Sequence, residues 1–278
     1  MNTAEILIPT LHDTDRDAIL DHLCACDTRL GELIREVGHC EINITRYQSL
    51  YQALLRAIVY QQLAGKAAAA IFARVQRLFV ANDAPPDADP ATLPFPTPEQ
   101  IAAASVERLR SAGLSNAKAL AVKDLAAKTL DGTVPTLEEA RSLTDEELIE
   151  RLTEVRGIGR WTVEMMLIFH LGRLDVLPVA DYGVRKGFAL TYRMRDLPKP
   201  DRMARQAEKW RPYRSVASWF MWRAIELEAA RRKAEGIAPV PPKKNAAAKK
   251  GKAAKKKSST AKRAGSRKKA RPSTKRKS

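Results

Sequence analysis

LIERLTEVRGIGRWTVEMML, residues 148–167, consists of two amphipathic runs separated by a break that contains Gly157 and Gly159. The spacing of the apolar residues predicts a helix on each side of the break. Glycine tolerates positive φ and lets a ligand approach the backbone, so the break predicts a tight hairpin whose N–H groups, at the start of the second helix, are open to a phosphate. An ordinary turn between two helices fits the same two glycines. The surrounding sequence decides between these interpretations.

Further segments extend the pattern on both sides of the hairpin. Residues 172–188 read GRLDVLPVADYGVRKGF and place a lone carboxylate, Asp181, twenty-two residues beyond Gly159. Upstream lie AIVYQQLA (57–64) and LRSAGLS (109–115), and downstream lies WRPYRS (210–215), followed by Trp219 and Trp222. With these segments in this order, the chain resembles the helix-hairpin-helix DNA glycosylases over roughly residues 45 to 230. Within that superfamily it is most similar to the DNA-3-methyladenine glycosylase II branch, whose members remove alkylated bases.

Periodicity indicates an all-α fold. Helical spacing covers residues 15–37, residues 46–80 with an interruption near 61–65, and the segments 99–111, 115–130, 145–154, 160–171, 182–192, 201–209 and 213–233. The alternation typical of strands is almost absent, and the proline-rich residues 82–98 predict a loop. The resemblance implies two helical subdomains flanking a cleft, with the N-terminal and C-terminal helices in one subdomain. We expect an N-terminal helical segment (1–44) packed on the core, a glycosylase domain (45–235) and a tail (236–278).

The positive charge is concentrated in the tail. The chain has a formal net charge of +17, yet residues 241–278 hold 17 Lys and Arg and no acidic residue, which leaves 32 of the 49 basic residues against 32 acidic ones in the rest. A segment with so little to bury is predicted to be disordered. It would add salt-sensitive affinity for DNA phosphates without sequence preference. A solubilising appendage, or a contact with RNA or a membrane surface, fits the same composition.

The resemblance assigns the catalytic role to Asp181. A fixed carboxylate beside the sugar would stabilise the positive charge that develops when an N-glycosidic bond breaks, and it can activate water. Capping the helix that begins at Tyr182 is an alternative and compatible role. Relatives that also cut the strand carry a lysine after the residue matching Arg160. This chain has Trp161 there, which predicts a monofunctional enzyme that uses water.

The resemblance also implies a base pocket and a wedge. Related enzymes line the pocket with aromatic residues at the positions of Trp161, Tyr182 and Trp222, and Met165 stands where one relative has a tyrosine. Electron-rich rings suit a cationic alkylated base. The space left by a flipped base would be filled from residues 61–63 (Gln61, Gln62 and Leu63), with Gln62 favoured and Leu63 next. A helix kink with hydrogen-bonded glutamines fits the same residues.

The resemblance implies backbone contacts with DNA at the hairpin, from Gly157, Ile158, Gly159 and Arg160. By the same resemblance, the carbonyl groups of Thr153, Val155 and Ile158 could hold a structural monovalent cation. The four histidines lack ligand spacing and three cysteines are too few for an iron–sulfur cluster, so we expect no cofactor.

We expect the protein to bind duplex DNA that contains damaged bases and to act as a monomer. We expect no association with a membrane. The absence of a secretion signal and of long apolar runs predicts a cytoplasmic, nucleoid-associated protein in a bacterium, or a nuclear one in a eukaryote. Our first hypothesis is excision of 3-methyladenine and related purines in base excision repair. The alternatives are the same fold acting on uracil, hypoxanthine or an oxidised purine, and a non-catalytic nucleoid DNA-binding protein.

Overall fold

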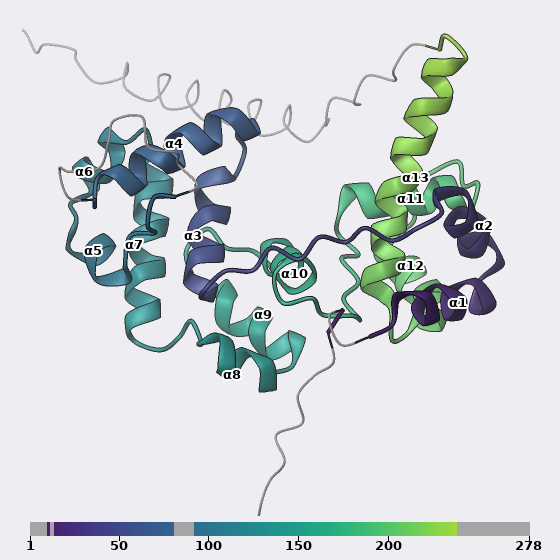
Figure 1. Cartoon of the computed structure of the whole chain (residues 1–278), viewed down its shortest axis with the longest axis horizontal. Helices are drawn as coiled ribbons and strands as arrows, with labels where there is room; N and C mark the ends of the chain where they lie inside the picture. The colour runs from purple at the N-terminus through teal and green to yellow at the C-terminus, as the bar shows by residue number, and fades with distance from the viewer. Residues whose placement is uncertain (1–9, 12–13, 81–91, 238–278) are drawn as a thin grey trace, which may run out of the picture. The chain divides into compact units, whose positions relative to one another are not determined.

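The computed structural model describes residues 10–11, 14–80 and 92–237 (Figure 1). The predicted tail begins at Gly236, so all of it except Gly236 and Ile237 lies outside the described residues. Most of the loop predicted over residues 82–98 lies outside them as well.

Helices make up almost all regular structure in the described part of the chain. They are α1 (Arg16–Cys26), α2 (Thr28–Val37), α3 (Leu50–Tyr60), α4 (Gly65–Arg77), α5 (Pro98–Ala103), α6 (Val106–Ser111), α7 (Asn116–Leu130), α8 (Leu137–Ser142), α9 (Asp145–Thr153), α10 (Arg160–Phe169), α11 (Tyr182–Thr191), α12 (Pro200–Ala207), the 3-10 turn η1 (Glu208–Trp210) and α13 (Arg214–Ala234). Among the described residues, strand pairing is limited to one isolated bridge between Thr10 and Arg173. The all-α prediction is confirmed.

Capping residues explain where the helices differ from the predicted segments. Asp27 divides the run expected over residues 15–37, because its backbone is extended at φ −146° and its carboxylate caps α2. Ser105 divides residues 99–111 in the same way, since its hydroxyl accepts the N–H of Arg108 at the start of α6. A capping box formed by Thr136 and Glu139 begins α8, a short helix that lies outside the predicted segments.

Two hydrophobic cores organise the helices. The first is built mainly from α3 to α10, and the second combines α1 and α2 with residues 174–184 and with α11, α12 and α13. Phe169 and Trp222 pack against both cores. The N-terminal and C-terminal helices thus share one subdomain, as the resemblance implies, whereas the cleft between the subdomains stays a prediction.

The cores belong to one compact unit, which ends at Glu228 inside α13; a second unit begins at Ala229. The predicted boundaries at residues 44/45 and 235/236 stay predictions. Among the described residues, no helix combines the length and the apolar character needed to cross a bilayer.

Candidate active site

Asp181 is the N-cap of α11. Its backbone is extended (φ −65°, ψ 125°), and its Oδ1 accepts the N–H of Val184 at 2.7 Å. An aspartate at this position satisfies one of the open N–H groups of the first turn and is favoured by the positive end of the helix dipole. The capping role and a catalytic role are therefore compatible in this structure.

Two tryptophans from different helices donate hydrogen bonds to the same carboxylate. Nε1 of Trp222, on α13, lies 3.0 Å from Oδ1 of Asp181, and Nε1 of Trp161, on α10, lies 2.7 Å from Oδ2. Trp161 is 50% exposed, while Trp222 is half-buried against Phe169 at a ring distance of 5.7 Å. Three N–H groups from three helices thus fix the orientation of the carboxylate.

Glycines on α11 allow α13 to come this close. A Cβ at Gly187 would lie 1.8 Å from the backbone oxygen of Met221, so the two helices touch through their main chains at this point. One turn earlier, a Cβ at Gly183 would lie 2.7 Å from the Trp222 indole and 3.0 Å from Oδ1 of Asp181. The absence of both side chains lets the indole reach the carboxylate.

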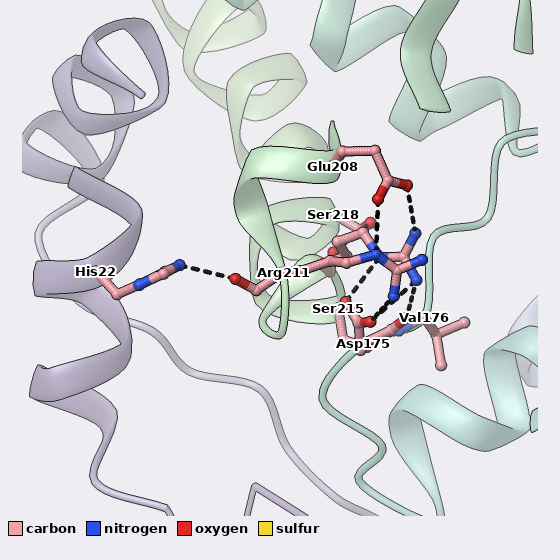
Figure 2. Close-up of polar contacts among 8 residues, drawn as sticks. His22, Asp175, Val176, Glu208, Arg211, Ser215 and Ser218 are labelled. Carbon is pink, nitrogen blue, oxygen red and sulfur yellow. Dashed lines mark hydrogen bonds and ion pairs between the residues drawn. The ribbon is translucent and has the colours of Figure 1, made fainter. Parts of the chain in front are cut away.

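A polar clamp ties the segment before Asp181 to the start of α13 (Figure 2). The Asp175 carboxylate accepts hydrogen bonds from Arg211 and from Nε of Arg214, the latter at 2.7 Å. Ser215 Oγ accepts the Val176 N–H at 2.9 Å, and the Ser215 N–H donates to the Leu174 carbonyl at 2.9 Å. The clamp holds the first turn of the helix that bears Trp222 against the segment that leads to Asp181.

The start of α10 carries a second charged cluster. Arg160 pairs with Glu146 and, through Nε at 3.1 Å, with Glu164 one turn later. Glu164 is only 4% exposed, and this burial raises the pKa of its carboxyl group although Arg160 acts in the opposite direction. In this structure Arg160, which the resemblance assigns to DNA binding, is thus bound to two carboxylates.

The remaining predicted pocket residues lie next to the carboxylate in the chain or one helical turn from Trp161. Tyr182 is the first residue of α11 and is 63% exposed. Met165 lies one turn after Trp161 on α10 and packs against the first core. Trp219 is 7% exposed and packs within the second core, so it is a packing residue.

The hairpin and the predicted wedge are in contact. Gly157 takes the left-handed conformation (φ 81°), and Gly159 caps α10 without a side-chain hydrogen bond. Ile158 between them is 5% exposed and belongs to the first core, and its N–H donates to the Val155 carbonyl, so a contact of Ile158 with DNA stays a prediction. Residues 61–63 connect α3 to α4, and Nε2 of Gln61 donates to the Gly157 carbonyl at 3.0 Å.

The three carbonyl groups predicted to hold a cation lie at the end of α9 and in the hairpin. Thr153 is the last residue of α9, and the Val155 carbonyl accepts the Ile158 N–H at 3.0 Å. A carbonyl oxygen has a second lone pair. Cation binding stays a prediction.

A surface depression of about 640 Å³ lies at the other end of α11, lined by residues 192–199, 201, 202 and 205. Asp181 stands at the N-terminus of that ten-residue helix, roughly 15 Å away along the axis at the usual rise per residue. The depression is therefore separate from the site described above.

Sequence reasoning missed the residues that support the site. Neither Gly183 nor Gly187 received a role, although a four-residue glycine spacing on a helix indicates a face that another backbone can approach. The contacts of Asp175 with Arg211 and Arg214, and those of Lys118 with the end of α3, cannot be recognised from the local sequence, because they join distant parts of the chain.

Comparison with known proteins gives a consistent result. The family model described as HhH-GPD superfamily base excision DNA repair protein matches residues 55–212. The DNA-3-methyladenine glycosylase 1 of Schizosaccharomyces pombe is 38% identical over 225 residues, which cover 81% of this chain and 91% of that protein.

Two solved structures share the fold. A 3-methyladenine DNA glycosylase of Schizosaccharomyces pombe in complex with abasic DNA aligns with a TM-score of 0.62 at 38% identity, covering 74% of this chain and 95% of the other. A DNA-3-methyladenine glycosidase from Bacillus halodurans aligns with a TM-score of 0.66 at 31% identity, covering 76% and 91%. The superfamily model spans more than half of the sequence, including the hairpin and Asp181, and the chain belongs to the HhH-GPD superfamily of base excision DNA repair proteins.

Proposed function

We propose that this protein is a monofunctional DNA glycosylase that releases alkylated purines of the 3-methyladenine type from duplex DNA by hydrolysis. The observation that carries the proposal is the carboxylate of Asp181, held by the N–H groups of Val184, Trp161 and Trp222 beside exposed aromatic rings. The names of the similar proteins from Schizosaccharomyces pombe and Bacillus halodurans support the substrate class.

Asp181 supplies the charge that the reaction needs. As the N-glycosidic bond breaks, the sugar becomes positively charged, and a carboxylate that is already oriented stabilises that charge without reorganisation. The same carboxylate can orient a water molecule toward the sugar and accept its proton. The bond to Trp161 engages Oδ2, and the half-exposed indole has room to move when a nucleotide enters.

Exposed aromatic faces favour a cationic base. A purine methylated at a ring nitrogen carries positive charge and is already a good leaving group, so stacking contributes more than acid catalysis. Trp161 and Tyr182, which are 50% and 63% exposed, are the rings available for that contact. Met165 would leave the pocket wider than a tyrosine would, which favours a broad range of alkyl groups.

The position after Arg160 favours hydrolysis over strand cleavage. A lyase needs an amine that forms a Schiff base with the sugar. Here the position holds Trp161, whose nitrogen donates to Asp181 and is not nucleophilic. We expect an intact abasic site as the DNA product.

Duplex DNA would be bound by the hairpin and by residues 61–63. The uncapped start of α10 after Gly159 offers N–H groups to a phosphate, and exposed Gln62 and Leu63 would fill the space left by the flipped base. Such an enzyme would work as a monomer on chromosomal DNA, in the nucleoid or the nucleus.

The test is base release from duplex DNA treated with a methylating agent, with Asp181→Asn as the control. Asparagine keeps an oxygen for the Val184 and Trp222 N–H groups, so the variant should fold and bind DNA. We expect free 3-methyladenine from the wild type alone, and strand breaks only after alkaline treatment. An active Asp181→Asn enzyme would exclude the mechanism.

The same assay on duplexes with uracil, hypoxanthine or an oxidised purine tests the substrate class. Release of one of these bases, but of no alkylpurine, would keep the fold and change the lesion. Tight binding without any release would indicate a non-catalytic DNA-binding protein.

A further inference from the structure

The connection between α3 and α4 has a backbone conformation that its own residues do not favour. Gln62 has φ 58°, and among the described residues only Arg193 is another non-glycine with positive φ. A side chain with a Cβ disfavours this left-handed region, so the surroundings have to hold it there. The conformation leaves Gln62 and Leu63 exposed at the turn.

Lys118, in the first turn of α7, stabilises this connection between α3 and α4 through its ammonium group. Its Nζ donates to the Val59 carbonyl at 2.6 Å and to the Gln61 carbonyl at 2.7 Å. These carbonyls lie at the C-terminal end of α3, where a cation is favoured by the helix dipole. Burial lowers the pKa of the Lys118 ammonium group.

The turn is also tied to the hairpin through the Gln61 side chain. Its Nε2 donates to the Gly157 carbonyl at 3.0 Å, and Gln61 itself is half-buried. The side chain of Gln61 therefore points to the hairpin, and Gln62 and Leu63 are the two residues left at the tip.

The hairpin rests on the same helix that carries Lys118. The Arg156 N–H donates to Oδ2 of Asp124 at 2.7 Å, and a Cβ at Gly157 would lie 3.5 Å from that of Ala121. Successive turns of α7 thus support both elements. Residues 61–63 and the hairpin thus both contact α7, and Gln61 bridges them.

We propose that Lys118 and Gln61 are positioning residues that hold the 61–63 wedge and the hairpin as one preorganised unit for base flipping. This inference rests on the proposed function. A wedge that already has its inserted shape does not have to be ordered while it enters the duplex, so the cost of flipping is lower. The bond-breaking step, which depends on Asp181, is not assigned to either residue.

Lys123 provides a matched control on the same helix. Its Nζ donates to the carbonyls of Ala102 and Ala104, at 2.7 and 2.5 Å, at the end of α5. The chemistry equals that of Lys118, but the loop it supports is not the wedge. A merely structural role for Lys118 predicts that Lys118→Met and Lys123→Met behave alike.

The experiment measures insertion of the wedge separately from chemistry. A duplex with 2-aminopurine beside a tetrahydrofuran abasic analogue reports unstacking of the 2-aminopurine by its fluorescence. The analogue carries no base, so there is no N-glycosidic bond to cleave. Wild type, Lys118→Met, Lys118→Arg, Lys123→Met and Gln61→Ala are compared at a temperature well below all their melting temperatures. Base release from methylated duplex is measured in parallel at saturating enzyme.

We expect Lys118→Met to lower the equilibrium for unstacking about tenfold, as for loss of a hydrogen-bonded charge. Gln61→Ala should reduce it as well, Lys118→Arg should restore most of it, and Lys123→Met should match the wild type. Normal unstacking by Lys118→Met, or an equal loss in Lys123→Met, would overturn the inference. If the wild type unstacks the duplex but releases no base, the proposed function is refuted; a loss of unstacking in Lys118→Met but not in Lys123→Met would then still support the positioning of residues 61–63.

Discussion

Asp181 takes its orientation from residues that are distant in the sequence. Val184 lies three residues away, but Trp161 and Trp222 lie 20 and 41 residues away, and each donates one hydrogen bond. Oδ1 receives two of the three N–H groups and Oδ2 only one. Under the proposed function, Oδ2 is the oxygen that we expect to face the sugar, because it has only one hydrogen bond in this structure.

Removing the indole N–H of Trp222 tests this arrangement. Trp222→Phe keeps an aromatic ring but loses the bond to Oδ1, so we expect a fall of about tenfold or more in the single-turnover rate of base release. Trp219→Phe, one turn earlier in the second core, is the control and should lower the melting temperature while sparing the rate. Equal rates for the two variants would contradict the positioning role of Trp222.

A methyl group at Gly183 tests the same contact from the other side. Gly183→Ala would place a Cβ 2.7 Å from the Trp222 indole, so the ring has to move away from Asp181. A misplacement of about 1 Å in an active site can cost roughly a hundredfold in rate. Gly65→Ala, where no atom lies within 4 Å of the added Cβ, should leave turnover unchanged.

The pair of helices α1 and α2 is fastened to the rest of the second core at their junction. Asp27 is 3% exposed; it ends α1 and caps α2. Its carboxylate also accepts hydrogen bonds from Tyr192 and Trp210 and forms an ion pair with Lys209. One buried carboxylate thus connects several elements of that core. Burial alone would raise the pKa of Asp27, but these donors outweigh it and the pKa is lowered.

This shift gives a pH-dependent contribution to stability. Because the folded-state pKa lies below the ordinary value of 3.8, the contribution is present above that value and is lost as the pH falls through the folded-state pKa. Asp27→Asn should lower the free energy of unfolding by about 3 kcal/mol at pH 7. Urea unfolding of both proteins at pH 7 and at acid pH should show that the difference in their free energies of unfolding becomes smaller as the pH falls.

Asp15→Asn serves as the control for this series, because Asp15 caps α1 by itself through a bond to the exposed Asp17 N–H. We expect a much smaller and local effect. A difference between wild type and Asp27→Asn that stays constant down to about pH 3, below the ordinary aspartate pKa, would argue against the carboxylate as the source of that stability.

At the scale of the whole molecule, the charge is divided between the body and the tail. Residues 241–278 hold 17 of the 49 basic residues and no acidic one, so the rest of the chain has no formal excess charge. Lysine and arginine that bind phosphates release counterions and make binding depend steeply on salt. The catalytic residues proposed here all lie in the body.

Deleting residues 241–278 separates the two contributions. We expect weaker binding to duplex DNA and a smaller slope of log Kd against log salt concentration. The slope should fall by about 0.9 for each phosphate that the tail neutralises. Base release at saturating enzyme and low salt should be retained. Loss of all release under those conditions would show that the body needs the tail for catalysis.

Sequence by itself determined most of the helices, the hairpin and the position of the carboxylate, but not the short helix α8. Periodicity and glycines report on neighbours in the chain, so the runs on either side of Gly157 and Gly159 and the aspartate before α11 can be recognised from the order of residues alone. Helix ends were less accurate where a capping side chain such as Asp27 or Ser105 interrupts a continuous pattern.

Only the tertiary structure decided which of these residues meet. The contact between Trp222 and Asp181 depends on two glycines that let α13 approach α11, and the contact between Gln61 and Gly157 depends on α7 beneath both. The first contact joins residues 41 positions apart in the sequence, and the second joins residues 96 positions apart. Local pattern carries no information at that range, because the packing of whole helices sets which side chains come within hydrogen-bond distance.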